Sequence, residues 1–164
     1  MRKILRIATV VLLVALSFWM GTVFTDKARL TDNVIRLHVV ADSDSSQAQE
    51  LKLKVRDAIL DELHDVMDEF PDMETAKAYL EEQLPKLEQV ANQVLQLSGS
   101  DCKAKVSFHK ETFPVREYDN FKLPSGIYEA IRVTIGSGEG KNWWCVVFPL
   151  CPHPIPGIRD DAKL

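Results

Sequence analysis

The sequence contains few of the residues from which metal sites are built. Its four histidines, His38, His64, His109 and His153, are scattered along the chain, and no two of them stand at the spacing of metal ligands. We therefore expect neither a metal ion nor any other cofactor.

Two short motifs begin like ligand-binding loops but lack residues that such loops need. Gly136–Lys141 is rich in glycine, yet a phosphate loop continues with Ser or Thr and then a helix, whereas here Asn142 and a strand-like run follow. Asp42–Ser46 begins like a calcium loop, but Gln47 replaces the required glycine and Leu53 the required glutamate. We interpret the first motif as a hairpin turn and the second as a turn that caps a helix.

Acidic residues are absent from the first 24 positions. Arg2, Lys3 and Arg6 precede a charge-free run from Ile7 to Phe24, which is the layout of a signal peptide or a signal anchor. The run barely reaches the roughly 20 residues that span a bilayer, and no A-x-A cleavage site follows, so both forms stay open. Because the basic end stays cytoplasmic, we expect the rest of the chain to be extracytoplasmic.

The chain beyond Phe24 is acidic and contains all the cysteines. It carries 17 of the 20 basic residues and all 24 acidic ones, a net charge of 17 − 24 = −7, which argues against nucleic acid as a partner. Cys102, Cys145 and Cys151 would lie where disulfides can form, and their odd number leaves at least one unpaired or bonded to another chain. Their pairing stays open.

Apolar periodicity begins with a strand and a long helix. Alternation over Val34–Ala41 predicts a half-buried strand. Apolar residues then recur at steps of three or four over residues 51–70, which predicts an amphipathic helix, and Ser46 with Gln49 forms a capping-box pattern before it.

A second helix and three strands follow. Residues 72–99 carry another apolar stripe, which Pro85 should kink or split. Alternation predicts strands over residues 104–109 and 127–135, and apolar residues on both faces of 143–148 predict a strand covered on both sides.

This order of elements predicts an α+β fold. We expect an N-terminal signal or anchor helix and then a β-α-α-β-β-β layer sandwich with a mainly antiparallel sheet. The expected divisions are a signal or anchor segment at 1–24, a linker at 25–33, one domain at 34–151 and an irregular tail at 152–164. The residues on the inward faces form the predicted core: Ile35, Leu37, Val55, Ile59, Leu63, Ile131 and Val133.

Cys145 and His109 form the one nucleophile and base pair that merits consideration. Such pairs meet in space and not in sequence. However, a reactive thiolate needs a helix N-terminus or a cationic neighbour, whereas Cys145 stands in an apolar strand between Trp144 and Val146. We expect no catalytic residues, and a packed or disulfide-bonded Cys145.

Four residues are candidates for contact with a partner: Arg116, Tyr118, Trp143 and Trp144. Trp, Tyr and Arg are the residues that most often anchor interfaces. Adjacent tryptophans in a strand face opposite ways, so one ring is expected inside and one outside, although burial of both stays open. Pro114 limits regular pairing near Arg116, which favours a loop or an edge strand there.

Five segments carry a family resemblance: Leu37–Ser45, Leu51–Asp57, Pro114–Tyr118, Arg132–Gly136 and Gly138–Pro149. Together they resemble the stage II sporulation protein R family, in order, from about Val34 to Cys151. The run Gly140-Lys141-Asn142-Trp143-Trp144-Cys145-Val146 is the most specific of these matches.

The resemblance implies a signalling protein and not an enzyme. Proteins of this family are made in the forespore of an endospore-forming bacterium and act in the space between forespore and mother cell. The implied partner is a membrane-embedded aspartic protease, which is activated by contact and then processes the precursor of sigma factor E. Residues 7–24 would direct secretion or anchor the protein.

The resemblance ends near Cys151. The family usually reads Phe-Pro-Pro-Leu-Cys where this chain has Phe148-Pro149-Leu150-Cys151, and its members usually continue with further strand-like sequence. A truncation or frame disruption in the coding sequence would explain both differences and would put activity in doubt. Two other functions stay open: a cell-envelope hydrolase that uses Cys145 and His109, and a membrane-tethered structural or adhesion domain.

Overall fold

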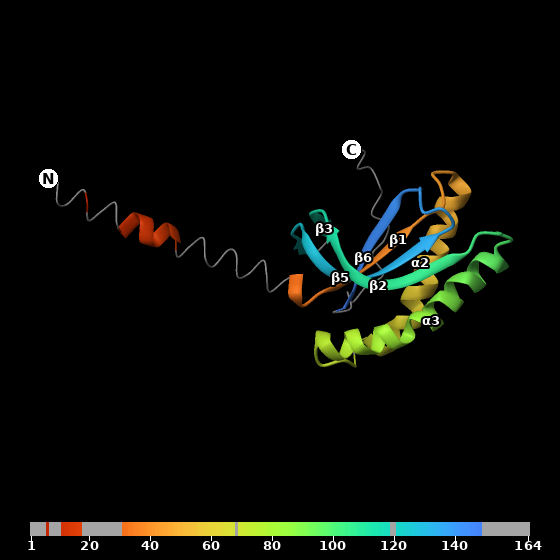
Figure 1. Cartoon of the computed structure of the whole chain (residues 1–164), viewed down its shortest axis with the longest axis horizontal. Coiled ribbons are helices and arrows are strands. Elements are labelled where there is room, and N and C mark those ends of the chain that lie inside the picture. The colour runs from red at the N-terminus through yellow and green to blue at the C-terminus, as the bar shows by residue number, and fades with distance from the viewer. Residues whose placement is uncertain (1–5, 7–10, 18–30, 68, 119–120, 149–164) are drawn as a thin grey trace.

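The fold is a mixed α+β arrangement around one four-stranded sheet (Figure 1). The computed structural model describes residues 6, 11–17, 31–67, 69–118 and 121–148. Its elements in chain order are β1 (Ile35–Val40), α2 (Ser46–Met67), α3 (Met73–Leu97), β2 (Ala104–Phe113), β3 (Arg116–Tyr118), β4 (Phe121–Leu123), β5 (Gly126–Ile135) and β6 (Asn142–Phe148).

The main sheet has the strand order β2-β5-β1-β6. Strand β1 lies parallel to β5 and antiparallel to β6, and β2 lies antiparallel to β5, so the predicted mainly antiparallel sheet is confirmed. Strands β3 and β4 form a separate antiparallel hairpin that the sequence reading did not predict. The order places β2 at one edge of the sheet and β6 at the other.

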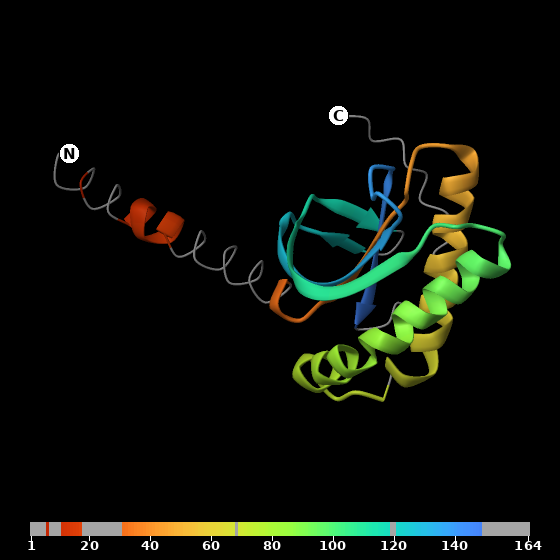
Figure 2. The same ribbon diagram turned by 45° about the vertical axis from the view of Figure 1, so that its right-hand side comes forward.

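Helices α2 and α3 lie together against one face of the sheet (Figure 2). Strand alternation sends Ile35, Leu37 and Val39 of β1 to this face. Ile131, Val133 and Ile135 of β5 lie beside them, whereas Ile127 at the start of β5 is exposed. The predicted core is confirmed, because all of its members belong to one cluster and are at most 1% exposed: Ile35, Leu37, Val55, Ile59, Leu63, Ile131 and Val133.

The two helices begin at side-chain caps. Asp72 accepts a hydrogen bond from the Thr75 N–H at 2.9 Å, which caps α3 and holds the pKa of Asp72 below its usual value. The capping box predicted at Ser46 is wrong by one residue: the hydroxyl of Ser45 accepts from the N–H of Ala48 at 3.2 Å. Helix α3 is a single element that runs through Pro85, so the predicted split is absent.

Pro85 removes one helical hydrogen bond, but buried residues on both sides of it hold α3 together. Leu80 and Leu87 are fully buried in the cluster between helices and sheet. Burial of a leucine side chain is worth about 1.5 to 3 kcal/mol, which for two leucines offsets the roughly 3 kcal/mol cost of an internal proline.

The predicted export segment falls mostly outside the described residues. Within it the structure describes a helical stretch at residues 11–17, where the apolar side chains of Val11 to Val14 and Leu16 are exposed. None of the helices in the described ranges is both long enough and apolar enough to cross a membrane.

Candidate functional site

The aspartates of Asp42–Ser46 bind the glycine-rich turn between β5 and β6. The Asp42 carboxylate accepts from the Ser137 N–H at 2.7 Å, and the Asp44 carboxylate accepts from the Lys141 N–H at 2.8 Å. In addition, the Gly140 N–H donates to the carbonyl of Ala41 at 2.9 Å. The two motifs that began like ligand loops therefore hold each other as turns. The interpretation of Gly136–Lys141 as a hairpin turn is wrong, because β1 lies between β5 and β6 and the two strands do not pair.

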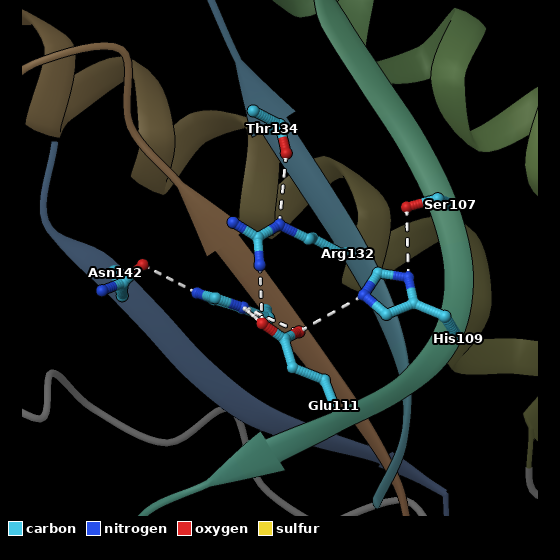
Figure 3. Close-up of polar contacts among 7 residues, drawn as sticks. Ser107, His109, Glu111, Arg132, Thr134 and Asn142 are labelled. Atoms are coloured by element: carbon cyan, nitrogen blue, oxygen red, sulfur yellow. Dashed lines mark hydrogen bonds and ion pairs between the residues drawn. The ribbon is translucent and has the colours of Figure 1, made fainter. Parts of the chain in front are cut away.

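Opposite the helices, the sheet carries a polar cluster centred on Glu111 (Figure 3). Glu111 of β2 accepts from Arg132 of β5 at 2.6 Å, and both of its oxygens lie 3.0 Å from Nδ1 of His38 on β1. The Nε2 atom of His38 lies 2.8 Å from Oδ1 of Asn142 on β6. Both ring nitrogens of His38 thus face oxygen atoms, and the cluster joins all four strands.

Ser107, His109 and Glu111 form a row along β2 that resembles a nucleophile, a base and its orienting acid. The Ser107 hydroxyl lies 3.5 Å from Nδ1 of His109, and Nε2 of His109 lies 3.9 Å from Glu111 (Figure 3). These distances exceed the 2.6 to 3.2 Å of an assembled catalytic pair. His109 is also 41% exposed, so the row is a solvated strand face.

The structure separates Cys145 from His109. Cys145 lies on β6 and faces the helices, whereas His109 lies on β2 and faces the polar cluster on the other side of the sheet. The two strands are opposite edges of the sheet, about 14 Å apart at roughly 4.8 Å per strand. The hydrolase interpretation is therefore wrong, because the two side chains point away from each other across the sheet.

The same arrangement limits the disulfides. Cys102 precedes β2 and Cys145 lies in β6, so they stand near opposite edges of the sheet, and a disulfide requires Cα atoms within about 7 Å. A bond between Cys102 and Cys145 is excluded. Cys151 lies outside the described residues, and its pairing stays a prediction.

Trp143 and Trp144 face opposite sides of β6, as alternation predicted, and both are half-buried. Trp143 packs toward the helices, with the Arg56 guanidinium 4.2 Å from its ring centre. Trp144 lies on the other side between Arg116, at 4.1 Å, and the ring of His38, at 5.5 Å and an interplanar angle of 24°. Each indole ring therefore has an arginine guanidinium stacked on one of its faces.

The hairpin positions the other two contact candidates. Arg116 opens β3, where its backbone pairs with Leu123 of β4, and its side chain reaches across to Trp144. Tyr118 pairs with Phe121 at the end of the hairpin, and its side chain is outside the described residues. The structure thus brings Arg116 and Trp144 together and leaves Trp143 on the helix side.

Comparison with known proteins shows the family. The family model described as stage II sporulation protein R matches residues 31–154. The chain belongs to this family. The stage II sporulation protein R of Bacillus subtilis (strain 168) is 39% identical over 123 residues, which are 74% of this chain and 55% of that protein. The chain therefore spans about half the length of this relative, and no solved structure matches it.

Two of the segments that carry the resemblance to the stage II sporulation protein R family lie in contact in the fold. The segment Leu37–Ser45 contains His38 and Asp44, and Gly138–Pro149 contains their partners: Asn142 and Trp144 contact His38, and the Lys141 N–H donates to Asp44. Leu37–Ser45 and Gly138–Pro149 thus form one contact region.

Sequence reading missed the buried Arg36 beneath this region. Arg36 is fully buried on β1, with its guanidinium 4.1 Å from the ring centre of Phe113 and 5.0 Å from that of Tyr128. Burial raises the pKa of Tyr128, against a smaller lowering by the charge of Arg36, and its hydroxyl donates to the carbonyl of Pro124 at 2.6 Å. The only signal in the sequence was a cation on the outer side of a predicted strand.

Proposed function

We propose that this member of the stage II sporulation protein R family is an exported forespore signal that activates a membrane-embedded aspartic protease by contact. That protease would process the precursor of sigma factor E. The family match over residues 31–154 carries the proposal and supports a role in sporulation. The separation of Cys145 from His109 agrees with signalling rather than catalysis.

The proposal includes the export route and the finer description of the chain. Residues 1–24 would be a signal peptide or an anchor helix, residues 25–33 a linker, and residues 34–151 a layer-sandwich domain in the intermembrane space. The irregular tail predicted at 152–164 lies outside the described residues. The charge-free run Ile7–Phe24 behind three basic residues supports this arrangement.

Export is tested with a reporter enzyme fused after Leu164. We expect activity from a reporter that works only outside the cytoplasm and none from one that works only inside. The reason is that the basic N-terminus stays on the cytoplasmic side, so the chain after Phe24 lies on the other side of the membrane. Replacing Leu12 and Leu13 with Arg should abolish export, while replacing Ser17 with Ala should leave it intact. Reporter activity confined to the cytoplasm would contradict the proposal.

The contact surface proposed for the protease comprises Arg116, Tyr118, Trp143 and Trp144. Arg116 and Trp144 support it best, because they stack on each other at 4.1 Å and Trp144 is only half-buried. The imidazole ring of His38 also stacks on Trp144. Its two ring nitrogens contact Glu111 and Asn142, which fixes the orientation of the ring. A rigid aromatic and arginine pair is typical of an interface anchor.

We expect Trp144→Ala and Arg116→Ala to lower protease activation at least about tenfold, which corresponds to about 1.4 kcal/mol of contact energy. The measurement is cleavage of the sigma-factor precursor during co-expression with the protease, together with thermal unfolding of each variant. Tyr118→Ala and Trp143→Ala complete the series.

Lys122→Ala is the matched control, since Lys122 lies on the same hairpin and its ion pair among the described residues is with the exposed Glu117. It should leave activation unchanged. If every inactive variant also unfolds at a lower temperature, the surface assignment is wrong.

A further inference from the structure

The chain enters the domain at one end of the sheet. Thr31 packs against Gly126 at the start of β5, since a Cβ added to Gly126 would stand 2.8 Å from Cγ2 of Thr31. Gly126 pairs with Phe113, the last residue of β2. In Figure 2 the described chain before β1 lies beside this end of β2 and β5, which we call the entry end.

The entry end carries exposed apolar side chains and no charge. Residues 112–115 and 123–128, which form it, contain no charged residue, although 27% of the chain is charged. Ile127 is 62% exposed and Val115 is 47% exposed. Among the described residues from 31 onward, the remaining exposed large apolar side chain is Leu97, at the end of α3. Single exposed apolar residues are ordinary, so the informative observation is that two of them share the entry end.

A buried apolar cluster fixes the backbone on which these two side chains stand. Phe113, Leu123 and Tyr128 are at most 3% exposed and belong to one cluster. Ile127 directly precedes Tyr128, and Val115 follows Phe113 by two residues. Val115 and Ile127 therefore form an apolar tip on a packed base.

The N-terminal segment would hold this end of the domain close to a membrane. The charge-free run ends at Phe24, and Thr31 already contacts the entry end. An extended chain covers at most about 3.6 Å per residue, so the seven steps from Phe24 to Thr31 span about 25 Å at most. With residues 7–24 in the bilayer as an anchor, the entry end stays within this distance of the bilayer surface.

The opposite end of the sheet is under no such restraint. Strand β2 has 10 residues from Ala104 to Phe113, so its first residue lies about 30 Å from the entry end. Leu97 belongs to that opposite end, because it precedes Ala104 by seven residues and the Asn92 side chain, one turn earlier in α3, binds the backbone of Ala104.

A lipid surface fits the entry end better than a second protein does. A stable protein interface takes about 20 to 30 residues from each partner, whereas the exposed apolar side chains here are those of Val115 and Ile127. Apolar side chains bind favourably at the boundary between lipid headgroups and acyl chains. The tether makes this contact intramolecular, so a small apolar area is sufficient.

We propose that Val115 and Ile127 dock into the lipid interface of the membrane that holds the N-terminal segment. Arg116 follows Val115 directly, so docking also brings the stacked pair of Arg116 and Trp144 close to the bilayer. A membrane-embedded partner would meet the pair there. The inference rests on the anchor form of the proposed function.

The test is NMR of the full chain, inserted by its N-terminal segment into phosphatidylcholine nanodiscs with one chain per disc. A fraction of the lipids carries a spin label on the headgroup, which broadens the amide signals of nearby residues. The amide signals of Val115 and Ile127 should be lost, and that of Leu97 should stay sharp. The double variant Val115→Ser with Ile127→Ser should recover both signals and keep the wild-type melting temperature, because both side chains are exposed.

Leu97→Ser is the matched control, because Leu97 is 81% exposed at the opposite end. It should leave the signals of Val115 and Ile127 lost. Val115→Leu with Ile127→Leu should also leave them lost, since leucine preserves the apolar tip. The proposal is wrong if the wild-type signals stay sharp, or if the serine variant is broadened equally, which would show proximity through the tether alone. It is also wrong if broadening needs two chains per disc, which would assign the entry end to a second copy.

The reporter fused after Leu164 separates docking from export. If that reporter is active only in the cytoplasm while the nanodisc signals are lost, the export proposal is wrong and the lipid contact stands. If the chain is exported and activates the protease while the signals of Val115 and Ile127 stay sharp in nanodiscs, the lipid contact is wrong and the proposed function stands.

Discussion

Replacing Gly136 with Ala should destabilise the domain by about 3 to 5 kcal/mol. Gly136 has a φ of +57°, which costs a residue with a Cβ roughly 1 to 2 kcal/mol. Its Cβ would also stand 2.0 Å from the carboxylate oxygen of Asp42 that accepts the Ser137 N–H. Asp42 must then move and leave that amide without its charged acceptor, a further loss of about 1.5 to 3 kcal/mol.

Gly99→Ala is the matched control for the backbone contribution. Gly99 has a similar φ of +72°, but an added Cβ there meets nothing within 4 Å. Gly99→Ala should therefore lower the free energy of unfolding by only about 1 to 2 kcal/mol. Urea unfolding of both variants isolates the crowding against Asp42 as the difference between them. Equal losses would show that the contact between the two turns contributes nothing to stability.

The elements of the main sheet and both helices were predictable because each sends a regular set of apolar residues to the core. The prediction that Val34–Ala41 is half-buried was wrong, because β1 is buried on both faces. Alternation in β1 and steps of three or four in α2 follow directly from which residues face the core, and the core residues were correctly assigned from them. The hairpin β3–β4 was not predictable in this way. Its strands have three residues each, too few to establish an alternating pattern.

The polar cluster was beyond sequence reading for a different reason. His38 and Glu111 are 73 residues apart in the sequence. They meet because their strands, β1 and β2, are the two neighbours of β5 in the sheet. Periodicity assigns a side chain to a face of its strand but does not give the order of strands in the sheet. The same limit kept the pairing of Cys145 with His109 open until the strand order placed them at opposite edges.

The contact candidates show what can be read from sequence and what cannot. Alternation correctly sent Trp143 and Trp144 to opposite sides of β6. It could not show that Arg116 would lie on Trp144, since that contact depends on the unpredicted hairpin. The role of these residues in binding remains a prediction.

Replacing Glu111 with Gln should destabilise the domain by about 3 kcal/mol. Glu111 is 18% exposed and faces His38, which is 7% exposed, and Arg132, which is 34% exposed. Breaking a buried ion pair costs about 3 to 5 kcal/mol because it leaves a charge uncompensated. Partial exposure of Arg132 allows water to solvate its guanidinium, so the lower end of this range applies. Glutamine preserves the shape, which confines the effect to charge and hydrogen bonding.

The same substitution should also weaken protease activation, because the ring of His38 supports Trp144 from below. Urea unfolding followed by tryptophan fluorescence measures the stability loss, and sigma-factor precursor cleavage measures activation at a temperature where the variant stays folded. Glu117→Gln is the control, since Glu117 pairs with Lys122 on the exposed hairpin and screened surface pairs contribute little. Its stability and activation should match wild type. If Glu111→Gln is as harmless as this control, the cluster neither stabilises the sheet nor holds Trp144 in place, and the rigid anchor on which the contact surface depends is absent.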